Sequence, residues 1–102
     1  MSNLDSNSGI RFDNVSFVQM GSSQDKTISR ATKISVKLVA GSVDIFDKNK
    51  SKVTFSKAGD ELVLEARSGF ALNETQIASG ASSSVLVVVN GGEITDTPKG
   101  GK

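Results

Sequence analysis

Hydrophobic residues recur at every second position over most of this chain. In residues 33–39, Ile34, Val36 and Leu38 alternate with Lys33, Ser35 and Lys37. Such alternation places one set of side chains on the covered face of a β-strand and the other set in water. The apolar positions are mostly Val, Ile and Phe, which suit a pleated sheet. The pattern predicts an all-β fold: a single-domain antiparallel β-barrel or jelly roll, with a two-sheet β-sandwich as the alternative.

Turn-forming residues divide the rest of the chain into further expected strands. A polar turn at 47–50 predicts a β-hairpin, and residues 73–84 are expected to be the longest loop, anchored by Ile77. The further strands are expected at 10–12, 15–20, 26–30, 42–46, 52–57, 61–66, around 70–72, and 85–89. The side chains expected to point inward from the later strands are Val43, Ile45, Val53, Phe55, Leu62, Leu64, Ala66, Phe70 and Leu72.

The run at residues 85–89 differs from the other strands because all five of its residues are apolar. A strand without a polar face is expected to be covered on both sides. It is therefore expected to be a central strand or a subunit contact, and Val85, Val87 and Val89 are the candidate interface residues.

The length of the chain predicts one domain with a marginal core, to which self-association would add stability. We expect a flexible N-terminal arm at 1–9, a β-barrel domain at 10–95 and a flexible C-terminal tail at 96–102. The first residues have neither a basic start nor an apolar stretch, and no segment is long and apolar enough to span a membrane. We therefore expect a location in the cytoplasm or in a virion, and no membrane partner.

The chain contains no His, Cys, Tyr or Trp. It thus lacks the side chain that titrates near neutral pH, the thiolate nucleophile and the commonest zinc ligands. Among its carboxylates, Glu61 and Glu65 on one strand would stand about 13 Å apart, too far for a glycosidase pair. These absences predict no catalytic residue, no metal and no cofactor, so that the chain is not expected to be an enzyme.

Two stretches resemble the central strands of a cupin barrel. They are LVAGSVDI at 38–45 and FSKAGDELVL at 55–64, with the runs at 70–72 and 85–89 in the places of later strands. In cupins a strand reaches a Gly, a hairpin follows, and a Gly-Asp turn leads into the next strand. The resemblance covers residues 33–89 and implies a cupin-like (RmlC-like) barrel.

The resemblance stops at the metal ligands. Cupins that bind metal carry a His-x-His pair and a Glu after the first Gly, and another His after the Gly-Asp turn, whereas the matching regions here read SVDI at 42–45 and EARSG at 65–69. The resemblance therefore implies a degenerate barrel. A small cupin family of nucleoside phosphorylases has a similar length, but its active-site residues map onto none of this chain's.

Positive charge gathers in one half of the sequence. Lys48, Lys50 and Lys52 surround the expected hairpin, within a span of eight basic residues between 26 and 57. These lysines form a possible basic patch for phosphates. Edge lysines that discourage aggregation, or basic strands pairing with acidic ones, would give the same pattern. A net charge of +1 makes nucleic acid an unlikely partner.

Three functional hypotheses follow. The first is a non-catalytic structural protein that associates with copies of itself, with another structural protein or with a larger particle such as a virion or phage. The second is a small cupin-like metabolite-binding protein or nucleoside phosphorylase-like enzyme, with Asp44, Lys37 and Arg67 as polar contacts in the barrel mouth. The third is a nucleic-acid accessory protein that uses Lys48, Lys50 and Lys52.

Overall fold

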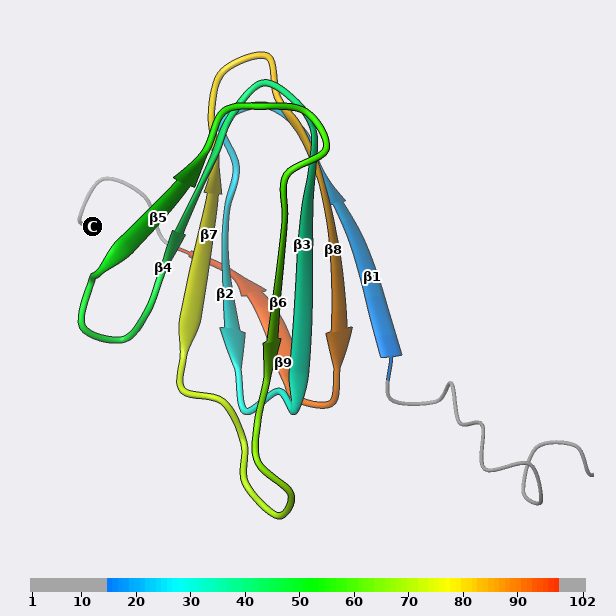
Figure 1. Cartoon of the computed structure of the whole chain (residues 1–102), viewed down its shortest axis with the longest axis vertical. Coiled ribbons are helices and arrows are strands. Elements are labelled where there is room, and N and C mark those ends of the chain that lie inside the picture. Colours follow the sequence, from blue (N-terminus) through cyan, green and yellow to red (C-terminus); the bar gives the residue numbers. More distant parts are fainter. Residues whose placement is uncertain (1–14, 98–102) are drawn as a thin grey trace, which may run out of the picture.

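The described part of the chain forms nine strands in two antiparallel sheets (Figure 1). A computed structural model describes residues 15–97, and these contain no helix, hence none that could cross a lipid bilayer. The strands are β1 (Val15–Met20), β2 (Asp25–Ser29), β3 (Lys33–Ala40), β4 (Val43–Phe46), β5 (Lys52–Phe55), β6 (Glu61–Glu65), β7 (Thr75–Ser79), β8 (Ser84–Asn90) and β9 (Glu93–Asp96).

The two sheets have the strand order of a jelly roll. One sheet has the order β1-β8-β3-β6 and the other has the order β5-β4-β7-β2-β9. Strands β1 to β8 divide four and four between the sheets, and β9 adds a fifth strand beside β2. The all-β, antiparallel jelly-roll prediction is confirmed.

The core lies between the two sheets and is entirely apolar at its centre. Every second residue of β3, Ile34, Val36 and Leu38, is fully buried, as the alternation predicted. The buried hydrophobic residues are Met20, Ile28, Ala31, Ile34, Val36, Leu38, Val43, Ile45, Ile77, Val85, Val87 and Val89. Burying each of the larger side chains stabilises the fold by roughly 1.5–3 kcal/mol.

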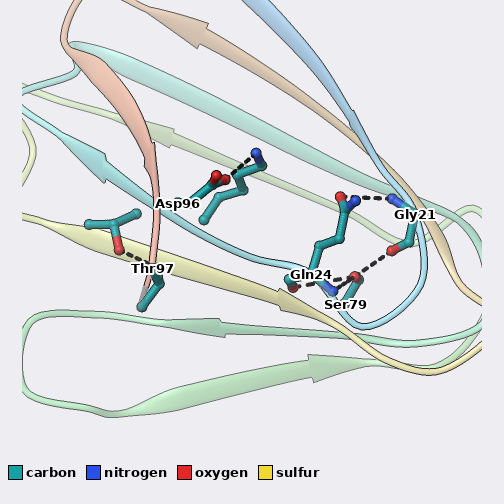
Figure 2. Close-up of polar contacts among 7 residues, drawn as sticks. Gly21, Gln24, Ser79, Asp96 and Thr97 are labelled. Atoms are coloured by element: carbon teal, nitrogen blue, oxygen red, sulfur yellow. Dashed lines mark hydrogen bonds and ion pairs between the residues drawn. The ribbon is translucent and has the colours of Figure 1, made fainter. Parts of the chain in front are cut away.

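Polar contacts close one end of the sandwich (Figure 2). The Ser79 hydroxyl of β7 accepts the backbone N–H of Gln24 at 2.9 Å and donates to the carbonyl of Gly21, so the β1–β2 turn is bound to β7. The Gln24 side chain accepts the N–H of Gly21. These bonds satisfy backbone groups that the turn would otherwise leave unpaired.

The same view shows how β9 is attached to β2. Lys26 Nζ lies 2.6 Å from Asp96 Oδ1, and the hydroxyls of Thr27 and Thr97 are hydrogen-bonded. The Gly91–Gly92 pair, with φ of +70° and +73°, turns the chain from β8 into β9. Asp96, which we expected to begin the flexible tail, therefore ends a strand.

The prediction of a long loop at 73–84 is wrong, because this stretch contains β7, an internal strand of the five-stranded sheet. Its inward residues are Thr75, Ile77 and Ser79, and all three are buried. Two of them are hydroxyl residues, so hydrophobicity alone did not show the alternation. Both hydroxyls are hydrogen-bonded: Thr75 donates to the carbonyl of Asn73 just ahead of the strand, and Ser79 bonds to the β1–β2 turn.

Two expected core residues lie on the surface. Val53 is 45% exposed on the edge strand β5, and Phe70 is 65% exposed in a turn after β6 rather than in a strand. The Phe70 N–H donates to the carbonyl of Arg67, and Gly69 has φ +85°. This turn directs the ring away from the core. The expected arm at 1–9 and strand at 10–12 lie outside the described residues.

A substitution at Gly41 tests how closely the β3–β4 turn approaches the β7–β8 loop. It has φ +83°, and a Cβ there would come within 2.7 Å of Ser83 Cα, whereas Gly59 has φ +99° with nothing within 4 Å of its Cβ position. We expect Gly59→Ala to lower the free energy of unfolding by about 1 kcal/mol from backbone strain alone. Gly41→Ala should cost at least ~1 kcal/mol more. Urea unfolding of both variants measures the difference, and equal losses would contradict the steric account.

Candidate functional site

The outer face of the four-stranded sheet carries an exposed apolar row across its strands. Phe17 of β1 is opposite Val88 of β8, which is opposite Ser35 of β3, which is opposite Val63 of β6. Phe17 is 69% exposed and Val63 is 49% exposed. Leu86, 39% exposed, lies in the next row of the same face. We call Phe17, Val63, Leu86 and Val88 the apolar face.

Charged residues of both signs flank the row that contains Phe17, Val88 and Val63. On one side Lys33 is opposite Glu65, and on the other Lys37 is opposite Glu61. Each pair joins β3 to β6, and all four residues are exposed. Opposite charges in register across two strands favour their pairing. They also leave this rim with no net charge.

A hollow of about 250 Å³ opens at the seam between edge strands β5 and β6. Its apolar lining includes Ile45, Val53, Leu62 and Leu64. Lys52 is among its polar lining residues and is exposed. This hollow, which we call the seam groove, can take a small apolar group.

The interior between the sheets is apolar in the part of the chain that the structure describes. Its centre is filled by the apolar side chains named above, and the buried polar residues among those described are Thr75, Ser79 and Ser83. Within residues 15–97 no three His, Cys, Asp or Glu side chains are close enough together to hold a metal ion. The donor set therefore does not fit the metal that many cupin barrels carry, and no reaction step through a metal can be derived.

The three ligand contacts proposed from sequence are not brought together. Asp44 lies on β4 between the inward Val43 and Ile45, so it faces outward from the five-stranded sheet, where Thr54 donates to its carboxylate at 2.7 Å. Lys37 is exposed on the outer face of the other sheet, and Arg67 is exposed in the loop after β6. Because the sheets separate Asp44 from Lys37, these residues line no common pocket.

The three lysines of the possible basic patch do lie on one hairpin, between β4 and β5. Lys50 is directed toward β7, where Nζ donates to Gln76 Oε1 at 2.8 Å. Asp47 accepts the backbone N–H groups of Asn49 and Ser51, so a carboxylate lies within the same turn. The hairpin therefore carries positive charge, but its acidic residue offsets part of it.

The interface residues expected in β8 point the wrong way for a contact. Val85, Val87 and Val89 are at most 2% exposed because they form the core, while Leu86 and Val88 face outward. The strand is central, between β1 and β3, as expected. Within residues 15–97 one of its faces is covered, and the apolar surface that the described residues leave to a partner is the opposite set of side chains.

Sequence reasoning missed Phe17 and Val63 as parts of one surface. The signal was present in the alternation, because Phe17 is out of phase with Val18 and Met20, and Val63 is out of phase with Leu62 and Leu64. Only strand pairing shows that these residues share a row, since β1 and β6 lie at opposite edges of the sheet.

The sequence matches no protein-family model and no curated protein. Its fold, however, is similar to several solved structures. A cupin superfamily protein from Desulfitobacterium hafniense has a TM-score of 0.59 and 14% identity, over 80% of this chain and 72% of that chain. An RmlC-like cupin from Desulfovibrio desulfuricans has a TM-score of 0.56 and 12% identity, over 79% and 76%.

A cupin-2 domain protein from Shewanella frigidimarina is similar to the same extent. Its TM-score is 0.54 with 12% identity, over 79% of this chain and 74% of that chain. Identities this low show the fold alone. The resemblance seen in residues 33–89 is thus confirmed as a cupin-like fold.

The opposite directions of neighbouring side chains in β8 can be tested by truncation. Val87→Ala removes buried methyl groups and should lower the free energy of unfolding by about 2 kcal/mol. Leu86→Ala removes a larger but exposed group and should cost less than about 1 kcal/mol. Urea unfolding at low protein concentration compares them. A larger loss for Leu86→Ala would contradict the assigned register.

Proposed function

We propose that this cupin-like chain is a non-catalytic protein that works by associating with further copies of itself through the apolar face. The observation that supports the proposal is the exposure of Phe17, Val63 and Leu86 on one side of one sheet. An exposed apolar patch with a polar rim is typical of an interaction surface. The outer face of the other sheet carries Asp44, Gln76 and Thr54 beside the half-buried Phe46, and none of its described residues is an exposed large hydrophobic residue.

The charged rim favours a second copy as the partner. Lys33 and Lys37 lie on β3, and Glu61 and Glu65 lie on β6. A face with equal numbers of each sign is able to meet a copy of itself with lysines near glutamates. A strongly basic or acidic partner would find no net charge to complement.

The size of the apolar face predicts a concentration-dependent association. Four strands about 4.8 Å apart and about 20 Å long present roughly 400 Å² of flat face. A standard interface buries about 800 Å² on each partner. The face alone is thus expected to give a weak contact. The matched cupin structures suggest no virion role, so the proposal is limited to self-association.

A matched pair of charge substitutions tests this proposal. Val63→Lys puts a charge into the apolar face, whereas Val53→Lys makes the same change at a residue of similar exposure in the seam groove. Because a buried unpaired charge is costly, Val63→Lys should weaken self-association at least ~10-fold, while Val53→Lys should leave it unchanged. Sedimentation equilibrium across a range of concentrations measures both. A native chain that stays monomeric at millimolar concentration would refute the proposal.

A second candidate function is the binding of a small apolar molecule in the seam groove. Val53 is 45% exposed, and Leu62 and Leu64 remain half-buried beside it, so the seam leaves apolar surface in contact with water. Two charged residues line this groove: Asp47, whose carboxylate accepts backbone N–H groups of its own turn, and Lys52, which would pair with an anionic group on the ligand. The position differs from the one first expected, which relied on Lys37, Asp44 and Arg67.

The dye anilinonaphthalene sulfonate, which is apolar and carries one negative charge, probes the groove. We expect its fluorescence to rise with the native chain and the midpoint of thermal unfolding to increase, since a ligand of the folded state stabilises it. Val53→Lys should abolish both effects, and Val63→Lys should preserve them. Loss of dye binding with Val63→Lys alone would instead place the dye on the apolar face and remove the support for a groove ligand.

A further inference from the structure

Strand β1 is the one edge strand among those described that carries no charged residue. The four edges of the two sheets are β1 and β6, and β5 and β9. β5 contains Lys52, β6 contains two glutamates and β9 contains Glu93 and Asp96, whereas β1 reads VSFVQM. Charges on edge strands protect them from pairing with other chains. β1 lacks this protection.

The geometry of β1 also suits strand pairing. It is six residues long and pairs in unbroken register with β8, which is its single neighbour in the described part of the chain (Figure 1). An edge strand presents a row of backbone N–H and C=O groups to whatever lies beside it. Ser16, Phe17 and Gln19 are exposed along it.

We propose that the β1 strands of two copies pair antiparallel across a twofold axis, so that two four-stranded sheets become one sheet of eight strands. The inference rests on the proposed self-association and adds a backbone contact between two copies to the contact made by the apolar face. It also addresses the small area of the apolar face, because pairing places the two faces side by side as one surface of twice the width.

The side-chain alternation of β1 sets the register. Directly opposite residues in an antiparallel pair point to the same face of the sheet. Val15, Phe17 and Gln19 alternate with the inward Val18 and Met20. Placing Phe17 opposite Phe17 of the second copy keeps outward residues together and inward residues together. It also forms an aromatic cross-strand pair.

The charges on β6 explain why this pairing would stop at two copies. In the eight-stranded sheet both outer edges are β6 strands, each carrying Glu61 and Glu65. Two such edges repel each other, so the sheet does not extend further. A twofold contact through β1 is thus closed rather than open-ended.

Disulfide formation distinguishes edge pairing from packing of the apolar faces. The chain has no Cys, so Phe17→Cys introduces a single thiol on an exposed side chain. Opposed residues in an antiparallel pair have Cα atoms about 4.5–5.5 Å apart, within the ~4.4–6.8 Å that a disulfide needs. Sheets packed face to face are about 10 Å apart, which is too far. Val63→Cys, on the same face but at the β6 edge, is the matched control for random collision.

We expect Phe17→Cys under mild oxidation to form a covalent dimer at least ~10-fold faster than Val63→Cys at equal concentration, as measured on a non-reducing gel. Equal rates would overturn the edge pairing. If the native chain self-associates and Val63→Lys weakens that association while Phe17→Cys fails to crosslink, then the proposed function stands and this inference fails. A native chain that is monomeric would overturn both.

Hydrogen exchange on the unsubstituted chain gives a second readout. Pairing should protect the β1 amides that point away from β8, and the protection should disappear on dilution to the monomer. The β6 amides that point away from β3 should exchange equally fast at both concentrations. Protection of β1 that is independent of concentration would show that the edge is covered within one copy, which would also overturn the inference.

Discussion

Packing between the inner faces of the two sheets is the interaction on which the rest of this protein depends. The inward residues of β3 and β8 meet those of β4 and β7, and the twelve buried hydrophobic residues form one cluster. In a domain this small, such a core is only just sufficient for stability. A polar cavity could be opened there only by removing side chains that the fold needs.

That constraint is the reason why the proposed function uses the surface of the protein. Among residues 15–97 the interior is filled mainly by Val, Ile and Leu side chains, and no cluster of metal-ligating groups lies there. The amino-acid composition of the chain, with no His and no Cys, is consistent with an apolar interior. What remains available for recognition is the outer surface of the two sheets, their edges and the seam between them.

The two outer faces differ in a way that the core does not require. On the five-stranded sheet, polar side chains of the outer face bond to one another, as Thr54 does with Asp44 and Lys50 with Gln76. On the four-stranded sheet, Phe17 and Leu86 are exposed and Val88 is half-buried on the outer face. Its two edges differ too, because β6 is flanked by glutamates and β1 is uncharged. The exposed apolar residues and the uncharged edge strand lie on the same sheet. This sheet is therefore the one that the proposed self-association uses.

By itself the sequence determined the fold class, the hairpin at 42–55 and the inward residues of β3, because alternation over several residues is a local property of the chain. It did not reveal β7, whose inward Thr75 and Ser79 are not hydrophobic, nor β9, which has one apolar residue, Ile94. The tertiary structure alone decided that Lys37, Asp44 and Arg67 stay apart and that Phe17 and Val63 share a row. Distance along the chain does not say which strands become neighbours, since β1 pairs with β8 through contacts more than sixty residues apart.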